Sequence, residues 1–151
     1  MIKQIKSFKY AFEGIWYTIL NETHMRFHIV ATVFVIIFGV LYELSPCEWA
    51  VLILTISTVM ALELVNTACE RMCNLYSKEK HPLIKIAKDV SAGAVLISAL
   101  GSIGVACFIF IKPDKIIQLF FMFSENPLYI FLLVIGIILG ILFILKFHSK
   151  K

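Results

Sequence analysis

The chain has 151 residues, of which 60% are hydrophobic and 16% are charged, and its mean hydropathy is +0.92. A soluble domain is about half apolar and about a quarter charged, so a water-soluble globule is excluded. The net charge is +4, but the 14 Lys and Arg form no dense basic block, which argues against a nucleic-acid partner. The composition predicts an integral membrane protein built from α-helices.

The N-terminal segment predicts an amphipathic surface helix over about residues 5–24. Apolar residues recur every three or four positions with lysines between them: Ile5, Phe8, Phe12, Ile15 and Ile19. The segment is too polar to cross a bilayer, so we expect it to lie in the membrane interface, with Trp16 at headgroup depth. A solvated helix packed on its own loops is the alternative.

Four long apolar runs follow, each near the ~20 residues that cross a hydrocarbon layer of ~30 Å. They cover about residues 27–44, 49–68, 90–111 and 128–147, and all four prolines fall between them. Residues 112–127 are predicted to be an extracytoplasmic loop. Residues 128–151 are predicted to form an additional membrane helix with a basic tail.

The basic residues are distributed unequally between the two sides of these spans. Only Lys112 and Lys115 fall on one side, and the other 12 Lys and Arg lie before the first span, between the second and third, or after the fourth. By the positive-inside rule, both termini and the loop at 70–89 face the cytoplasm of a bacterial cell.

Polar residues inside the second span mark a candidate active site. Glu63, Asn66 and Glu70 share one helix face, and Glu63 lies about 10 Å deeper than Glu70. The predicted topology brings Asn21–Glu22 and Lys88–Asp89 to the same side of the membrane. An ionisable residue within a span is costly in lipid and therefore suggests function, although a structural pair between helices is the alternative.

These residue types suit phosphoryl transfer to a lipid alcohol. Two carboxylates at the water edge suit Mg²⁺, a lysine beside them suits a polyphosphate, and the deeper carboxylate suits a general base for a hydroxyl. The chain has no GxxxxGK[ST] loop and no GxGxxG among its glycines. Any ATP site must therefore use side chains and a metal ion at the membrane surface.

The stripe from Glu63 to Glu70 resembles the ExxNxxxE signature of the small prokaryotic membrane diacylglycerol kinase family. Lys85-Ile-Ala-Lys-Asp resembles its AKD segment, and further family positions match at Phe12-Glu-Gly-Ile-Trp16, Asn21–Glu22 and Arg26. The resemblance covers about residues 5–111, so that 1–111 would be the lipid-kinase domain. It implies a homotrimer with active sites between subunits, each subunit having a surface helix and three spans.

The resemblance also implies a role for each matched residue. Glu63 would be the general base, and Glu22 and Glu70 would bind the metal. Phosphate or nucleotide contacts would come from Tyr10, Glu22, Asn66, Glu70, Glu79, His81, Lys88 and Asp89. Contacts with the lipid acceptor would come from Glu63, Trp16, Arg26 and Trp49. Lys88 and Asp89 have an alternative as a snorkelling anchor and a helix cap.

Three short segments look most like the Gram-positive branch of the family, whose members are similar to undecaprenol kinases: Met25–His28, Glu43–Trp49 and His81–Leu83. Undecaprenol is therefore the expected acceptor, with diacylglycerol as the alternative. The chain departs from the family at Asn74, where an Asp is common, which puts a charge-dependent nucleotide contact there in doubt.

Two other classes of protein fit the size of the chain. A four-span proton-coupled transporter would carry its coupling carboxylate nearer the midplane, and a structural assembly protein would not need a buried polar stripe. His24 and His28 are interpreted as interfacial side chains rather than metal ligands. Gly136 and Gly140 form a GxxxG that serves either as a packing face or as a lipid-exposed segment.

Overall fold

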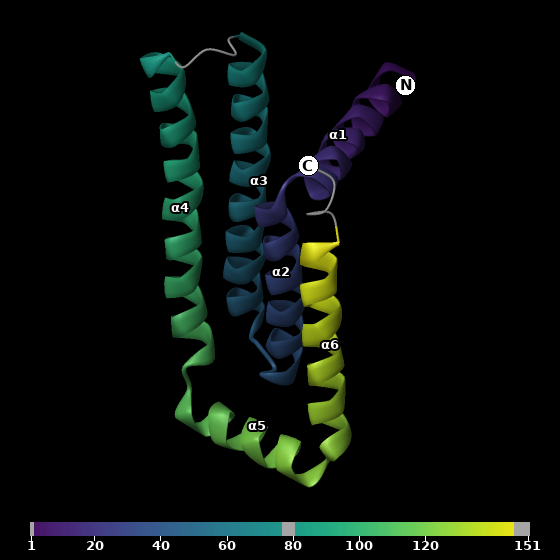
Figure 1. The fold of residues 1–151 in the computed structure, drawn as a ribbon. Helices are drawn as coiled ribbons and strands as arrows, with labels where there is room; N and C mark the ends of the chain where they lie inside the picture. Colours follow the sequence, from purple (N-terminus) through teal and green to yellow (C-terminus); the bar gives the residue numbers. More distant parts are fainter. Residues whose placement is uncertain (1, 77–80, 147–151) are drawn as a thin grey trace.

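The structure is a computed structural model that describes residues 2–76 and 81–146 (Figure 1). The regular elements in these ranges are all helices: α1 (Ile2–Asn21), α2 (Thr23–Leu41), α3 (Pro46–Tyr76), α4 (Pro82–Phe110), α5 (Pro113–Glu125) and α6 (Pro127–Leu145). Four of them, α2, α3, α4 and α6, are long and apolar enough to cross a membrane. The predicted all-α membrane architecture is confirmed.

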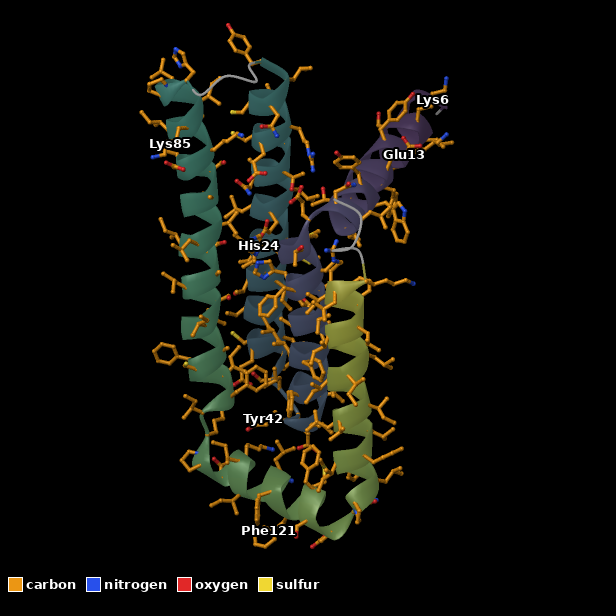
Figure 2. All side chains as sticks on the ribbon, viewed as in Figure 1. Lys6, Glu13, His24, Tyr42, Lys85 and Phe121 are labelled. Atoms are coloured by element: carbon orange, nitrogen blue, oxygen red, sulfur yellow. The ribbon has the colours of Figure 1, made fainter. Side chains whose placement is uncertain are left out.

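The four long helices run up and down beside one another (Figure 1). α3 packs along α4, and α2 packs against both α3 and α6. α5 crosses below the bundle and joins α4 to α6, and α1 leaves the top of α2 obliquely. We call the end where α1 joins α2 the α1 end, and the opposite end the α5 end. Figure 2 places Lys85 at the α1 end and Tyr42 at the α5 end.

Two helices are longer than their predicted spans. α3 has 31 residues and α4 has 29, or about 46 and 44 Å at about 1.5 Å per residue, against a hydrocarbon layer of ~30 Å. Both extend at the α1 end, so Glu70 and Asp89 lie within continuous helices. The prediction of a loop over 112–127 was wrong in one respect, because most of that connection is the helix α5. α5 begins at Pro113, and the missing N–H of a proline is tolerated there because first-turn N–H groups have no partner within the helix.

The turn between α2 and α3 is built from two capping motifs. The Leu44 N–H donates to Gly39 and the Glu43 N–H donates to Val40, with Glu43 at φ 50°, which is a Schellman ending of α2. Ser45 then caps α3: its hydroxyl and its N–H both donate to Glu48 Oε2, at 2.8 and 2.9 Å. These local bonds reverse the chain within four residues.

Glu48 also joins this turn to the end of α4, because its other oxygen accepts a hydrogen bond from Lys112. Lys115 approaches Glu43 at 3.5 Å beside it. The Lys112 bond, followed by those from Ser45, holds the pKa of Glu48 at about 2, below its ordinary 4.5. The charged form of Glu48 is therefore favoured in the folded protein.

This lowered pKa predicts a pH-dependent contribution to stability. The contribution is fully present above about pH 4.5 and is lost as the pH falls toward about 2. Glu48→Gln is therefore expected to lower the melting temperature in detergent by a few degrees at neutral pH, and the difference from wild type should shrink below pH 4.5. Glu125→Gln, at the exposed end of α5, is the matched control. A Glu48 difference that does not vary with pH would contradict the role of the carboxylate.

α6 packs on α2 through small residues. A Cβ added to Gly140 would lie 2.8 Å from Val30 Cγ1, and one added to Gly136 would lie 3.6 Å from the ring of Phe34. Of the two interpretations of GxxxG, the packing face is the one that the structure confirms, because a side chain at Gly140 would separate the two helices.

Candidate active site

Glu63 is buried in the interface between α2 and α3. Its residue surface is 3% exposed, and His28 Nε2 from α2 lies 3.2 Å from its Oε1. One turn further along α3, the Thr67 hydroxyl donates to the Glu63 carbonyl and stays within its own helix. A carboxylate that is shielded from water in this way requires a polar partner, and in this structure the imidazole of His28 on the neighbouring helix lies beside it.

Asn66 connects α3 to α4. Its Oδ1 accepts a 2.7 Å hydrogen bond from Ser91, and its Nδ2 points to Glu70 Oε1 at 3.5 Å. The Ser91 hydroxyl also lies 3.0 Å from the Lys88 carbonyl, one turn back in α4. The amide of Asn66 is therefore held in a defined orientation, with its donor group directed along the stripe toward the end of α3.

Lys88 reaches across the same pair of helices nearer the α1 end. Its Nζ donates to Asn74 Oδ1 at 2.6 Å. Asn74 is the position where the chain departs from the family pattern, and a neutral amide here orients the lysine without neutralising its charge. Lys88 is thus held in a half-buried position above the stripe.

Glu22 comes to α3 from the junction between α1 and α2. It is the N-cap residue of α2, with an extended backbone. Its Oε1 accepts a 2.7 Å hydrogen bond from Arg71. The same guanidinium lies over the ring of Tyr17, 5.4 Å from its centroid. Because Arg71 follows Glu70 directly, this ion pair brings Glu22 to the turn of α3 that carries Glu70.

Glu22 and Glu70 are the two carboxylates that the sequence predicts as magnesium ligands. Among residues 2–76 and 81–146, no three His, Cys, Asp or Glu side chains gather into a metal cluster. Mg²⁺ commonly takes one or two carboxylates together with waters and substrate phosphates, so two acidic side chains suffice. One oxygen of Glu22 is also bound by Arg71, so metal binding would compete with that ion pair.

Several predicted nucleotide and lipid contacts lie away from this cluster. Tyr10 and Trp16 are more than 60% exposed on α1, and Asp89 is exposed and faces Lys85 at 3.9 Å. His81 caps α4, accepting a hydrogen bond from the Leu83 N–H at Nδ1. Glu79 lies outside the described residues. The structure therefore brings Glu22, Glu63, Asn66, Glu70 and Lys88 together where the α1–α2 junction, α3 and α4 meet, and it leaves Tyr10, His81 and Asp89 outside.

Two predicted lipid contacts have other positions in the structure. Arg26 is 1% exposed, and its guanidinium donates hydrogen bonds to groups at helix ends. The acceptors are the carbonyls of Ile19, Leu20 and Ile144 and the Thr23 hydroxyl. Trp49 packs over Gly39 at the α5 end, about 21 Å along α3 from Glu63. Neither position supports contact with an acceptor hydroxyl at Glu63.

Three residues of the cluster were not predicted as site residues. His28 was interpreted as interfacial, Arg71 was counted only as a basic residue, and Ser91 was given no role. The position of Ser91, three residues after Lys88, offered a weak signal because i, i+3 residues share a helix face. Nothing in the sequence shows that His28 faces Glu63, since that depends on how α2 is rotated against α3.

Comparison with known proteins identifies the family. The sequence pattern described as prokaryotic diacylglycerol kinase matches residues 9–110, which include α2, α3, α4 and every member of the cluster. The chain belongs to the prokaryotic diacylglycerol kinase family. It is therefore a membrane lipid kinase of bacterial type, which phosphorylates a lipid alcohol and takes ATP as its phosphate donor.

Individual relatives carry two different names. The chain is 43% identical over 106 residues to the undecaprenol kinase of Bacillus subtilis, covering 70% of this chain and 86% of that one. It is 40% identical over 108 residues to a diacylglycerol kinase of Synechocystis, covering 71% and 62%, and 27% identical over 105 residues to that of Escherichia coli K12, covering 70% and 86%. No solved structure shows a significant match.

The extra helix of this kinase lies outside the family pattern. The match ends at residue 110, so α5 and α6 are additions to the family core. α6 packs on α2, and the ion-paired cluster lies between α2, α3 and α4. α2 therefore contacts both the added helix α6 and the candidate site.

Proposed function

We propose that this kinase transfers the γ-phosphate of MgATP to the hydroxyl of undecaprenol. The observation that carries the chemistry is the buried Glu63 carboxylate, with an amide one turn away and a second carboxylate two turns away on the same face of α3. The observation that favours this acceptor is the 43% identity with a relative named undecaprenol kinase.

The proposed step needs a base, a clamp for the phosphates and a site for the metal. Glu63 takes the proton from the acceptor hydroxyl, whose oxygen forms a bond to the γ-phosphorus while the bond to the departing ADP oxygen breaks. Lys88 and Asn66 orient the phosphates. Glu22 and Glu70 would hold Mg²⁺, which neutralises developing negative charge on the phosphates when bound.

Diacylglycerol is the second candidate acceptor, because a relative of nearly equal identity is named diacylglycerol kinase. Both acceptors present a primary hydroxyl beside apolar chains, so the same base serves either one. The transporter and assembly-protein alternatives are set aside, since the chain belongs to a family of enzymes.

We further propose that both termini face the cytoplasm and that the kinase works as a homotrimer. The orientation is supported by the 12 Lys and Arg that lie in sequence before the first span, between the second and third, or after the fourth, on the side where cytoplasmic ATP would be met. The trimer is supported by the family and by the many exposed apolar side chains on α3 and α4, such as Leu54, Ile97 and Phe108. If sites are shared between subunits, mixing inactive Glu22→Gln and Glu63→Gln chains should restore part of the activity.

The acceptor is tested by phosphate transfer from labelled ATP, with Mg²⁺, to undecaprenol and to dioleoylglycerol in separate mixed micelles. Glu63→Gln serves as the blank, and Glu125→Gln, an exposed acid on α5, serves as the matched active control. Faster transfer to undecaprenol supports the proposal. Faster transfer to dioleoylglycerol would assign the protein to phosphatidate synthesis, and transfer to neither would refute both acceptors.

A further inference from the structure

The side chain that meets Glu63 comes from α2 and not from the signature helix. His28 Nε2 lies 3.2 Å from Glu63 Oε1, and the side chains are 19% and 4% exposed. Within the described part of the chain, His28 alone lies within hydrogen-bond or ion-pair distance of this carboxylate. When Glu63 is ionised, its oxygens only accept, so a hydrogen bond between these two groups has the His28 Nε2–H as its donor.

A cavity of about 330 Å³ is lined in part by His28. It lies between α2, α3 and α4, and His28 is the only ionisable residue among those that line it. Two of the three hydroxyls in its wall, those of Thr55 and Ser102, donate to carbonyls of their own helices. The rest of the lining is almost entirely apolar, so its walls suit a lipid chain.

Glu63 is not part of the cavity wall, although Val59 and Met60, about one turn away on α3, are. His28 therefore stands at the boundary between the apolar cavity and the buried carboxylate. A buried carboxylate that has lost water keeps its charge and its direction only if a donor is fixed beside it. His28 is the side chain with a possible donor that this structure places there, with its Nε2 3.2 Å from Oε1.

We propose that His28 is a positioning residue for Glu63. This inference rests on the proposed function and extends it. The Nε2–H group of His28 holds Oε1, so that Oε2 faces the acceptor hydroxyl and takes its proton as that oxygen bonds to the γ-phosphorus and ADP leaves. His28 exchanges no proton with the acceptor. It acts on the rate by fixing the orientation of the base, as donors beside reactive ligands do elsewhere.

The test compares His28→Leu, which removes the donor, with His28→Gln, whose amide can donate to the same oxygen. The matched control is His24→Gln, one turn earlier on α2 and exposed (Figure 2). In the micelle assay, His28→Leu is expected to lower kcat about 10- to 100-fold while KM for ATP stays within about twofold. His28→Gln should recover most of the loss, and His24→Gln should match wild type.

A second experiment separates positioning from a merely structural role. His28→Ala leaves space beside the cavity, so added imidazole is expected to restore part of its turnover. The side-chain ¹⁵N resonance of His28 should also differ between wild-type protein and the Glu63→Gln variant. This measurement requires no His28 variant to fold.

Either of two results would overturn the inference: full kcat in His28→Leu, or a His28 ¹⁵N resonance that does not respond to Glu63→Gln. The inference would also be overturned if His28→Leu folds but has a low kcat, His28→Gln does not recover the loss, and imidazole does not restore His28→Ala. The role of His28 would then be structural. Failure of the proposed function is distinct, because it would appear as wild-type protein that phosphorylates neither acceptor.

Discussion

Glu63→Gln is expected to lower turnover by about 1000-fold or more while leaving the affinity for MgATP nearly unchanged. The amide keeps the size of the side chain but cannot accept the proton of the acceptor hydroxyl, and general bases contribute roughly 10² to 10⁴-fold to rate. ATP affinity should survive because the groups proposed to bind the phosphates, Lys88 and Asn66, are held by Asn74 and Ser91 and not by Glu63.

The measurement is turnover of labelled ATP beside equilibrium binding of MgATP to detergent-solubilised protein. Glu125→Gln at the end of α5 controls for the loss of an acidic charge. Wild-type turnover in Glu63→Gln would remove Glu63 as the base. A parallel loss of ATP affinity would instead indicate that the buried carboxylate maintains the site.

Arg26→Met is expected to destabilise the protein by about 3 kcal/mol, because it removes the donor of four hydrogen bonds. The side chain is 1% exposed. Three of its acceptors are carbonyls at the C-terminal ends of α1 and α6, where a cation is also favoured by the helix dipoles. Met preserves much of the volume but leaves these carbonyls without that partner.

Thermal unfolding in detergent should register this loss as a fall in melting temperature of about 10 °C. Arg26→Lys should recover only part of it, since one ammonium cannot reproduce the planar fork of donors. Lys9→Met, on the exposed face of α1, is the control. If Arg26→Met kept its melting temperature and only raised KM for the lipid, the contact with the acceptor predicted from the sequence would be the better explanation.

The added helix gives this arginine a role that the family core alone would not provide. Ile144 belongs to α6, beyond the matched residues 9–110, and its carbonyl accepts from Arg26 Nε at 3.1 Å. About one helical turn further from the α1 end, Gly140 lets α6 approach α2 at Val30. The extra span is therefore fastened to the same helix that presents His28 to Glu63.

Much of the architecture was predictable because it depends on local sequence. Four apolar runs of span length require helices in lipid, where each backbone donor must find its partner within the segment. The ExxNxxxE spacing places Glu63, Asn66 and Glu70 on one face in any straight helix. The GxxxG and the surface helix followed from the same helical periodicity, and the even number of spans puts both termini at one end.

The contacts between helices were not predictable, because periodicity does not determine how one helix is rotated or shifted against the next. That rotation decides that His28 faces Glu63, that Ser91 meets Asn66, and that Arg26 turns to helix ends instead of lipid. The sequence by itself determined the membrane class, the spans and the polar stripe, since these depend on composition and helical period. Only the tertiary structure decided the partner of each polar group, because a buried charge is satisfied by whichever neighbour packing brings within reach.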